Sequence, residues 1–185
     1  ELSPAAAERE EKAEIPRAVL GAMGELGFMG MTVPEEYGGA AADNVSYALA
    51  LMEIAAGDGA ISTVMSGHNS VGCSIVQKAG TEAQKHEWLP KLATAEVMVA
   101  VAVTEPDYGS DVASIKTTAV AAQQDGKDGY LINGVKTWCT FAARANVLML
   151  LARTDPDRTK SHKGLSVLIV PKPRGDAHGF VFNQP

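Results

Sequence analysis

The sequence has 185 residues, of which 46% are hydrophobic and 21% charged, with a formal net charge of -6 and a pI of about 5.2. This length and composition are typical of a soluble globular protein with one large or two small domains. The acidic balance excludes general nucleic-acid binding, which needs a basic face. No apolar stretch is long enough to span a bilayer, and no His, Cys, Asp and Glu cluster has metal-ligand spacing.

The two cysteines and the first residues of the chain bear on the cellular compartment in which the protein is expected to work. Cys73 and Cys139 are far apart in the sequence, so we expect two free thiols in a reducing environment. The chain begins Glu1-Leu2-Ser3-Pro4, without a methionine or a basic segment, so we expect no targeting peptide within it; removal of such a peptide upstream of Glu1 is the alternative.

Up to about residue 96, apolar residues recur at helical spacing. The spacing predicts one helix that stops at Gly27 and another that ends at Gly57. Asp43 or Asn44 can cap the second of these helices, because their side chains accept hydrogen bonds from free backbone N–H groups.

Two further helical segments are predicted before residue 96. The run of small residues over 61–76 favours a helix, although its Ser and Gly content weakens the signal. Thr81-Glu82-Ala83-Gln84 has the spacing of a capping box and opens a helix that we expect to be irregular at Pro90. His68 is more easily explained as a packing histidine than as a catalytic group.

After residue 96 the pattern changes to that of strands. A β-rich run covers 97–104, and 114–122 alternates between apolar and polar residues. A turn is predicted at 126–129 and a short strand at 130–132. Asn133-Gly134 is a strong hairpin signal, because this pair suits the two left-handed positions of a tight turn.

Two near-continuous apolar strands, 147–153 and 165–170, complete the pattern. Several short strands at close spacing predict a barrel or sandwich. The predicted fold class is therefore α+β: an all-α helical domain over 1–96, then a β-barrel or β-sandwich domain over 97–185. We expect the second domain to be truncated at the end of the chain.

The segment 103–111, Val-Thr-Glu-Pro-Asp-Tyr-Gly-Ser-Asp, is the first candidate binding segment. Gly109 allows a close backbone approach, and Ser110 offers a hydroxyl. The exposed backbone N–H groups of such a turn suit a phosphate or the edge of a flavin. An ordinary turn between two strands explains the segment better if it is taken alone.

The segment 133–140, Asn-Gly-Val-Lys-Thr-Trp-Cys-Thr, is the second. On a strand that follows a hairpin, Trp138 and Thr140 project from the same face. A flat ring beside a hydroxyl donor suits an isoalloxazine ring and its polar edge. A buried core tryptophan beside a strand threonine is the alternative.

Together the two segments resemble the middle domain of the acyl-CoA dehydrogenase family. The resemblance lies in the order Thr-Glu-Pro-x-x-Gly-Ser-Asp over 104–111, a β-hairpin, and Trp-x-Thr over 138–140. Val-Pro-Glu-Glu-Tyr-Gly-Gly at 33–39 and Gly-Thr-Glu-Ala-Gln-Lys at 80–85 resemble the N-terminal helical domain of the same family. Leu-Ala-Arg-Thr-Asp at 151–155 and Lys-Gly-Leu-Ser at 163–166 continue the match.

The resemblance implies FAD as the cofactor and an acyl-CoA as the substrate. The flavin-binding positions that it implies are Val101, Val103, Thr104, Gly109, Ser110, Trp138, Cys139 and Thr140. Of these, Thr104 would hydrogen-bond the isoalloxazine, Ser110 would contact both FAD and acyl-CoA, and Thr140 would approach N5. Tyr108 departs from the small residue usual in the family and would shape the substrate mouth. Cys139 replaces a β-branched residue.

The implied reaction is the oxidation of an acyl-CoA to the trans-2-enoyl-CoA. A carboxylate removes the pro-R α-proton while the β-hydride passes to flavin N5, which requires tight positioning and stabilisation of the developing enolate. In the family this carboxylate is a Glu of the C-terminal helical domain, so no residue of this chain is assigned as the base. A flavin-dependent oxidase or monooxygenase on the same scaffold, and a non-catalytic acyl-CoA-binding relative, are the alternatives.

The resemblance also implies partners and a location. It implies electron-transfer flavoprotein as the acceptor and a homodimer or homotetramer as the assembly. The expected location is the cytoplasm of a bacterium, or the mitochondrial matrix if the protein is eukaryotic. Segment 143–157 and the Thr-Glu-Pro region resemble dehydrogenases of branched dicarboxylic acyl-CoAs such as methylsuccinyl-CoA.

Overall fold

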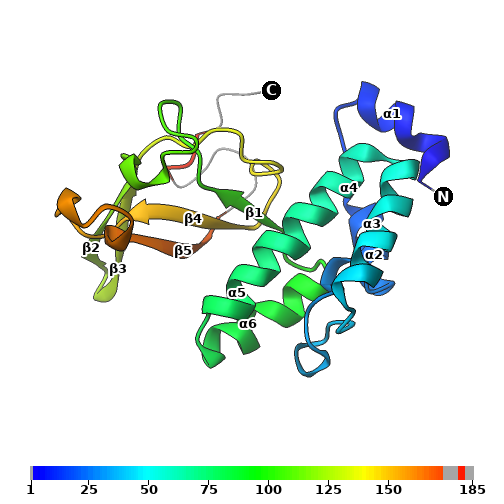
Figure 1. Cartoon of the computed structure of the whole chain (residues 1–185), viewed down its shortest axis with the longest axis horizontal. Coiled ribbons are helices and arrows are strands. Elements are labelled where there is room, and N and C mark those ends of the chain that lie inside the picture. The colour runs from blue at the N-terminus through cyan, green and yellow to red at the C-terminus, as the bar shows by residue number, and fades with distance from the viewer. Residues whose placement is uncertain (1, 173–178, 182–185) are drawn as a thin grey trace. The chain divides into compact units, whose positions relative to one another are not determined.

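The computed structural model of the chain describes residues 2–172 and 179–181. The chain divides into two compact units, Glu1–Val99 and Ala100–Pro185, here called the helical unit and the sheet unit. Figure 1 shows helices in the first and strands in the second. The predicted α+β class, with the helices first, is therefore confirmed.

The helical unit contains six α-helices among its described residues. In chain order they are α1 (Ala6–Glu11), α2 (Arg17–Glu25), α3 (Asn44–Gly57), α4 (Gly59–Ser66), α5 (Ser74–Ala79) and α6 (Glu82–Ala93). A π-helical turn, Gly67–Cys73, joins α4 to α5. The sequence pattern did not predict α1, which is short and has no apolar stripe.

Local capping signals set several of these helix ends. The carboxylate of Asp43 accepts the N–H groups of Val45 and Ser46, both at 2.8 Å, and so caps α3 as expected. The capping box of Thr81 and Gln84 is present at the start of α6. The helix continues through Pro90 to Ala93, so the proline does not end it.

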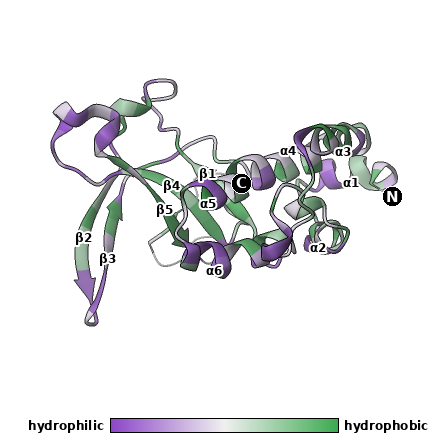
Figure 2. Cartoon of the chain, turned by 60° about the horizontal axis from the view of Figure 1, so that its bottom comes forward, coloured by the Kyte–Doolittle hydropathy of each residue, from purple (hydrophilic) through white to green (hydrophobic). Residues whose placement is uncertain are grey.

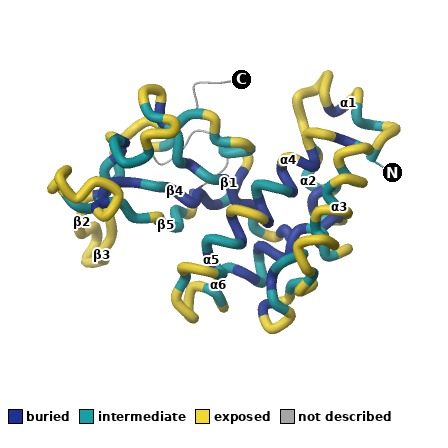
Figure 3. The backbone as a smooth tube through the Cα atoms, in the orientation of Figure 1, coloured by how far each residue is buried: buried dark blue, intermediate teal, exposed yellow. Residues whose placement is uncertain are grey.

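The core of the helical unit comes from every long helix except α3. Its largest fully buried side chains are Leu20, Met29, Ile61, Met65, Leu89, Leu92 and Met98. α3 buries no residue and exposes Val45, Leu49 and Met52, and Figure 3 shows it in the teal and yellow of half-buried and exposed residues. No helix among the described residues is long and apolar enough to cross a membrane.

The sheet unit is built around one buried strand. Its strands are β1 (Val99–Ala102, which starts at the last residue of the helical unit), β2 (Thr118–Gln124), β3 (Lys127–Asn133), β4 (Val147–Arg153) and β5 (Leu165–Pro171). β4 is antiparallel to β5 along its whole length and meets β2 in parallel at Arg153. The described residues therefore form one mixed five-stranded sheet, with no second sheet packed on it among them.

The hairpin of this sheet differs from the predicted one. The turn between β2 and β3 is Asp125-Gly126, with φ of 52° and 73°, and Gln124 pairs with Lys127. The turn expected at 126–129 was therefore misplaced. Two left-handed residues match a type I′ turn, and Figure 2 shows the hairpin hydrophobic near the rest of the sheet and hydrophilic towards this tip.

Asn133-Gly134 forms no hairpin, and that prediction was wrong. β3 ends at Asn133, and the chain continues without regular structure as far as residue 139. Gly134 is needed for a different reason: a Cβ there would lie 2.3 Å from the Thr117 hydroxyl. Its glycine reflects a close approach of two chain segments rather than a turn.

Candidate functional site

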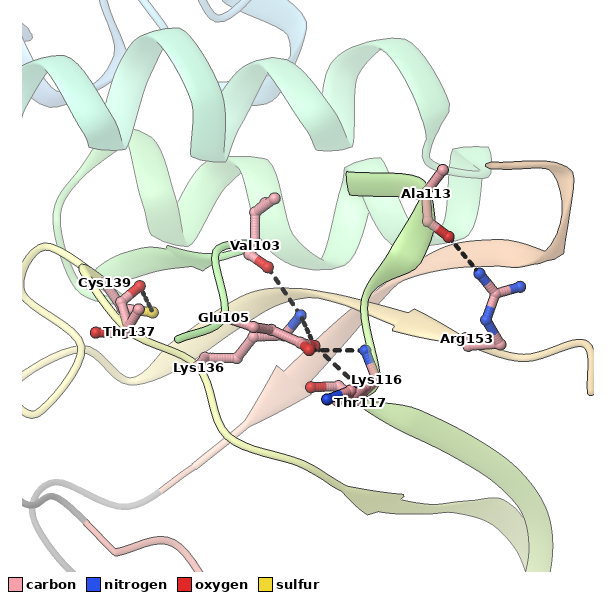
Figure 4. Close-up of polar contacts among 9 residues, drawn as sticks. All are labelled: Val103, Glu105, Ala113, Lys116, Thr117, Lys136, Thr137, Cys139 and Arg153. Atoms are coloured by element: carbon pink, nitrogen blue, oxygen red, sulfur yellow. Dashed lines mark hydrogen bonds and ion pairs between the residues drawn. The ribbon is translucent and has the colours of Figure 1, made fainter. Parts of the chain in front are cut away.

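The two candidate segments lie side by side in the sheet unit. The backbone N–H of Thr137 donates to the carbonyl of Thr104 at 2.9 Å. One residue earlier, Lys136 Nζ donates to the carbonyl of Val103 at 2.9 Å (Figure 4). The strand end and the irregular segment after β3 therefore form one continuous surface.

A buried carboxylate anchors this junction. Glu105 accepts the backbone N–H of Lys116 at 2.7 Å, that of Thr117 at 2.9 Å, and Lys136 Nζ at 3.0 Å. The side chains of Glu105 and Lys136 are only 5% and 9% exposed. Neither residue was a predicted site residue. The available signal was a single lysine in the second segment and three acidic residues in the first, of which the sequence does not single out Glu105.

The environment of Glu105 keeps it ionised. Burial alone raises the pKa of Glu105, but hydrogen bonds from Thr117, the Lys116 backbone and Lys136 outweigh it and lower that pKa to about 2. The carboxylate is therefore charged at neutral pH, and donors already occupy both of its oxygens. It is therefore neither free nor basic enough to abstract a proton.

Tyr108 closes a tight turn at the edge of the same surface. The backbones of Glu105 and Tyr108 exchange two hydrogen bonds, of 3.0 and 3.1 Å. The Lys116 ammonium lies 5.3 Å from the centre of the Tyr108 ring and 3.1 Å from the Asp107 carboxylate. This cation–π contact gives the half-buried ring a defined place.

The predicted flavin-binding positions of the first segment differ in their exposure to solvent. Val101, Val103 and Thr104, at the end of β1, are half-buried, whereas Gly109 and Ser110 are exposed. A Cβ on Gly109 would meet no atom within 4 Å, so this loop has free space beside it.

The second segment is not a strand, so the expected projection of Trp138 and Thr140 from one strand face is wrong. Trp138 has a left-handed backbone with φ of 56°, and Thr140 begins a turn over 140–144. The alternative of a buried core tryptophan also fails, because Trp138 is 89% exposed. Cys139, between them, packs against the buried face of the sheet.

These features fit a flavin. Among the described residues, no hydrogen bond engages the hydroxyls of Thr104, Ser110 or Thr140. The large aromatic ring of Trp138, which follows Thr137 in the chain, is uncovered. An aromatic ligand with a polar edge would cover that ring, and its polar edge would form hydrogen bonds with the free hydroxyls. FAD has an isoalloxazine ring of this kind.

Two other predicted features are structural. His68 is buried, with Nε2 2.9 Å from the carbonyl of Leu92 and the N–H of Val99 3.4 Å from Nδ1, which confirms it as a packing histidine. Cys73 and Cys139 are free thiols. The described part of the chain contains no group of three or more His, Cys, Asp and Glu that could hold a metal ion.

Two family models match the chain. The model described as "Acyl-CoA dehydrogenase, N-terminal domain" matches residues 1–96. The model described as "Acyl-CoA dehydrogenase, middle domain" matches residues 100–185. Together they leave almost none of the chain unmatched.

Individual relatives show the same similarity. An acyl-CoA dehydrogenase of Bacillus subtilis (strain 168) is 41% identical over 93% of this chain and 44% of its own length. A (2S)-methylsuccinyl-CoA dehydrogenase of Cereibacter sphaeroides is 38% identical over 90% of this chain and 29% of its own. The crystal structure of a Mycobacterium smegmatis glutaryl-CoA dehydrogenase in complex with FADH2 has a TM-score of 0.80 and 35% identity, over 92% of this chain and 41% of that one.

The chain thus spans less than half the length of these relatives. Both of its units are matched, in order, by the models of a single family. The chain belongs to the acyl-CoA dehydrogenase family.

Proposed function

We propose that the protein containing this chain oxidises an acyl-CoA thioester to the 2-enoyl-CoA with FAD as its cofactor. The observation that carries the proposal is the junction where Thr137 bonds Thr104, with the exposed Trp138 next in the chain and, among the described residues, the hydroxyls of Thr104 and Thr140 free. Membership of the family supplies the reaction class.

In this proposal the chain supplies one wall of the cofactor site. FAD, when bound, would supply the acceptor for a hydride from the acyl β-carbon. Trp138 would cover the ring and exclude water from it, while Thr104 and Thr140 would hydrogen-bond its polar edge. Ser110 would contact both the cofactor and the acyl-CoA, which would help to hold the substrate in reacting orientation.

The proton-abstracting carboxylate is proposed to lie outside this chain. Around the junction, Glu105 is paired with Lys136, and Asp107 is paired with Lys116. The relatives extend well beyond the matched length, and we place the base, further FAD contacts and the oligomer interface in that additional part. Electron-transfer flavoprotein is the proposed acceptor.

A substrate panel on the intact protein tests the function. Short linear, branched and dicarboxylic acyl-CoAs are supplied with a dye or electron-transfer flavoprotein as acceptor, and 2-enoyl-CoA is followed by mass. We expect one 2-enoyl-CoA for every two electrons passed to the acceptor, and a short, branched or dicarboxylic acyl group as the best substrate. Stoichiometric hydrogen peroxide or a hydroxylated product would identify an oxidase or monooxygenase instead. Acyl-CoA binding without any product would identify a non-catalytic relative.

Residues 1–185 alone provide a second test. Because the base and part of the cofactor site are proposed to lie elsewhere, this segment should bind FAD weakly and show no turnover. Titration of FAD by flavin fluorescence and an assay with butyryl-CoA measure both properties. Rapid turnover by this segment would contradict the proposed division of the site.

A further inference from the structure

We propose that Glu105 and Lys136 are positioning residues of the cofactor wall, whose buried ion pair holds segment 138–140 against Val103 and Thr104. The inference rests on the proposed function, because FAD is the ligand it concerns. Neither residue needs to touch the cofactor. Each acts through the backbone that carries the groups which do.

The contacts of Lys136 support this role. Its ammonium donates to the carbonyl of Val103 at 2.9 Å and to Glu105 at 3.0 Å, so it crosses from one segment to the other (Figure 4). Glu105 is in turn held by the backbone N–H groups of Lys116 and Thr117. The pair therefore links three stretches of chain: the end of β1, the start of β2 and the segment after β3.

The segment it positions has two other attachments: the Thr137 N–H donates to the Thr104 carbonyl, and Cys139 packs against the core of the sheet. Residues 134–139 have no regular structure and no strand partner. Trp138 is 89% exposed and combines this with a left-handed backbone, φ 56°, which costs a non-glycine residue energy. Core packing does not hold such a residue. Its place follows from the two residues before it, Lys136 and Thr137, and from Cys139 after it.

Replacement of one residue of the ion pair should have two separable effects, one on the stability of the protein and one on the position of segment 138–140. In Lys136→Met, Glu105 keeps an uncompensated buried charge, which lowers stability, and the link to the Val103 carbonyl is lost, which loosens the wall. In the double variant Glu105→Gln/Lys136→Met the charge is removed, but methionine still cannot donate to Val103. Stability and positioning therefore separate in the double variant.

The experiment measures three properties of the intact protein and its variants: the melting temperature without FAD, the FAD dissociation constant, and the visible absorption spectrum of bound FAD. We expect Lys136→Met and Glu105→Gln to raise the dissociation constant on the order of tenfold or more, as for a displaced binding group. In the double variant the melting temperature should return towards that of the wild type, while the dissociation constant stays raised and the flavin spectrum stays altered. Lys160→Met, which removes the exposed pair with Asp155 in the same unit, is the matched control and should change none of the three.

Two results would overturn the proposal. One is a double variant in which FAD affinity recovers together with melting temperature, because the pair would then serve stability alone. The other is folded single variants with wild-type FAD affinity and spectrum. A wild-type protein that binds no FAD would instead refute the proposed function, so the two failures are distinguishable.

Discussion

Arg9 and Asp58 form an ion pair across 49 residues of sequence, with 2.7 Å between Arg9 Nη2 and Asp58 Oδ2. Their side chains are 9% and 6% exposed. Asp58 also accepts the backbone N–H of Ile61 and so caps α4, while Arg9 belongs to the short helix α1. The pair therefore fastens α1, which has little apolar surface of its own, to the start of α4.

Replacement of Arg9 by methionine should lower the free energy of unfolding of the helical unit by about 3–5 kcal/mol, because it leaves a buried carboxylate unpaired. Urea denaturation followed by circular dichroism measures the change. Lys12→Met is the control, because Lys12 pairs with Glu8 on the open surface and should show no measurable effect. Equal changes in the free energy of unfolding for the two replacements would show that burial of the Arg9–Asp58 pair does not determine its contribution to stability.

His68 should make the helical unit sensitive to mild acid. Burial lowers the pKa of His68 from 6.5 to about 4, and nearby Arg17 adds to this, against a hydrogen bond to Leu92 that raises it. The unfolded chain therefore binds the proton more tightly, so stability is complete above pH 6.5 and falls by about 3 kcal/mol as the pH drops to 4.

The measurement is the free energy of unfolding between pH 7 and pH 4. His68→Gln should remove most of this slope, at some cost in stability at pH 7, because its amide must replace two hydrogen bonds. The same replacement at exposed His162 should leave the slope unchanged. A slope that survives His68→Gln would assign the acid sensitivity to other groups.

The π-helical turn contains two glycines with opposite expected behaviour. A Cβ on Gly72 would lie 2.1 Å from Val99 Cγ1, a buried side chain, whereas a Cβ on Gly67 would meet nothing within 4 Å. Gly72→Ala should therefore cost about 1–3 kcal/mol through overpacking. Gly67→Ala should be neutral or stabilise by up to about 1 kcal/mol, because alanine restricts the unfolded chain.

Thermal unfolding of the two alanine variants side by side checks this prediction. The pair is well matched, because both glycines lie in the same turn and only the space beside them differs. A stable Gly72→Ala variant would show that Val99 moves aside freely.

Trp138 should matter for the ligand and not for the fold. Because its side chain is 89% exposed, Trp138→Ala should change the free energy of unfolding by less than about 0.5 kcal/mol. Loss of an aromatic contact worth about 0.5–1.5 kcal/mol should weaken FAD binding by up to about tenfold.

Calorimetric titration with FAD and chemical denaturation of the intact protein measure the two effects. Trp88→Ala, at a half-buried position on α6 in the helical unit, is the comparison and should affect stability more than FAD affinity. A Trp138→Ala variant that unfolds easily and binds FAD normally would reverse the assignment.

Several elements were predictable because their signals are local. Asp43 as a cap, and the box of Thr81 and Gln84, act within three residues of a helix start, so their spacing in the sequence is sufficient. β4 was predicted over its full length, because a strand buried on both faces forms a near-continuous apolar run, here ended by Arg153. The family, too, followed from motifs in a fixed order.

The hairpin shows where local signals become ambiguous. Asp125-Gly126 and Asn133-Gly134 both suit a type I′ turn, and both lie beside strand-forming residues. Only the pairing of β2 with β3 selects the first, and Gly134 is then required by the nearby hydroxyl of Thr117. The position of the hairpin turn therefore depends on contacts between strands, and a local sequence pattern carries no information about those contacts.

Sequence alone was sufficient for the order of a helical region before a strand region and for the family, because both follow from patterns and motifs of neighbouring residues. Three-dimensional packing decided how the two candidate segments meet. Glu105 pairs with Lys136 across 31 residues, and Trp138 lies in an irregular segment with its side chain exposed to solvent. A buried charge is stable only beside a partner, and the fold can bring that partner from a distant part of the sequence. Whether an aromatic ring is exposed likewise depends on which distant segments cover it.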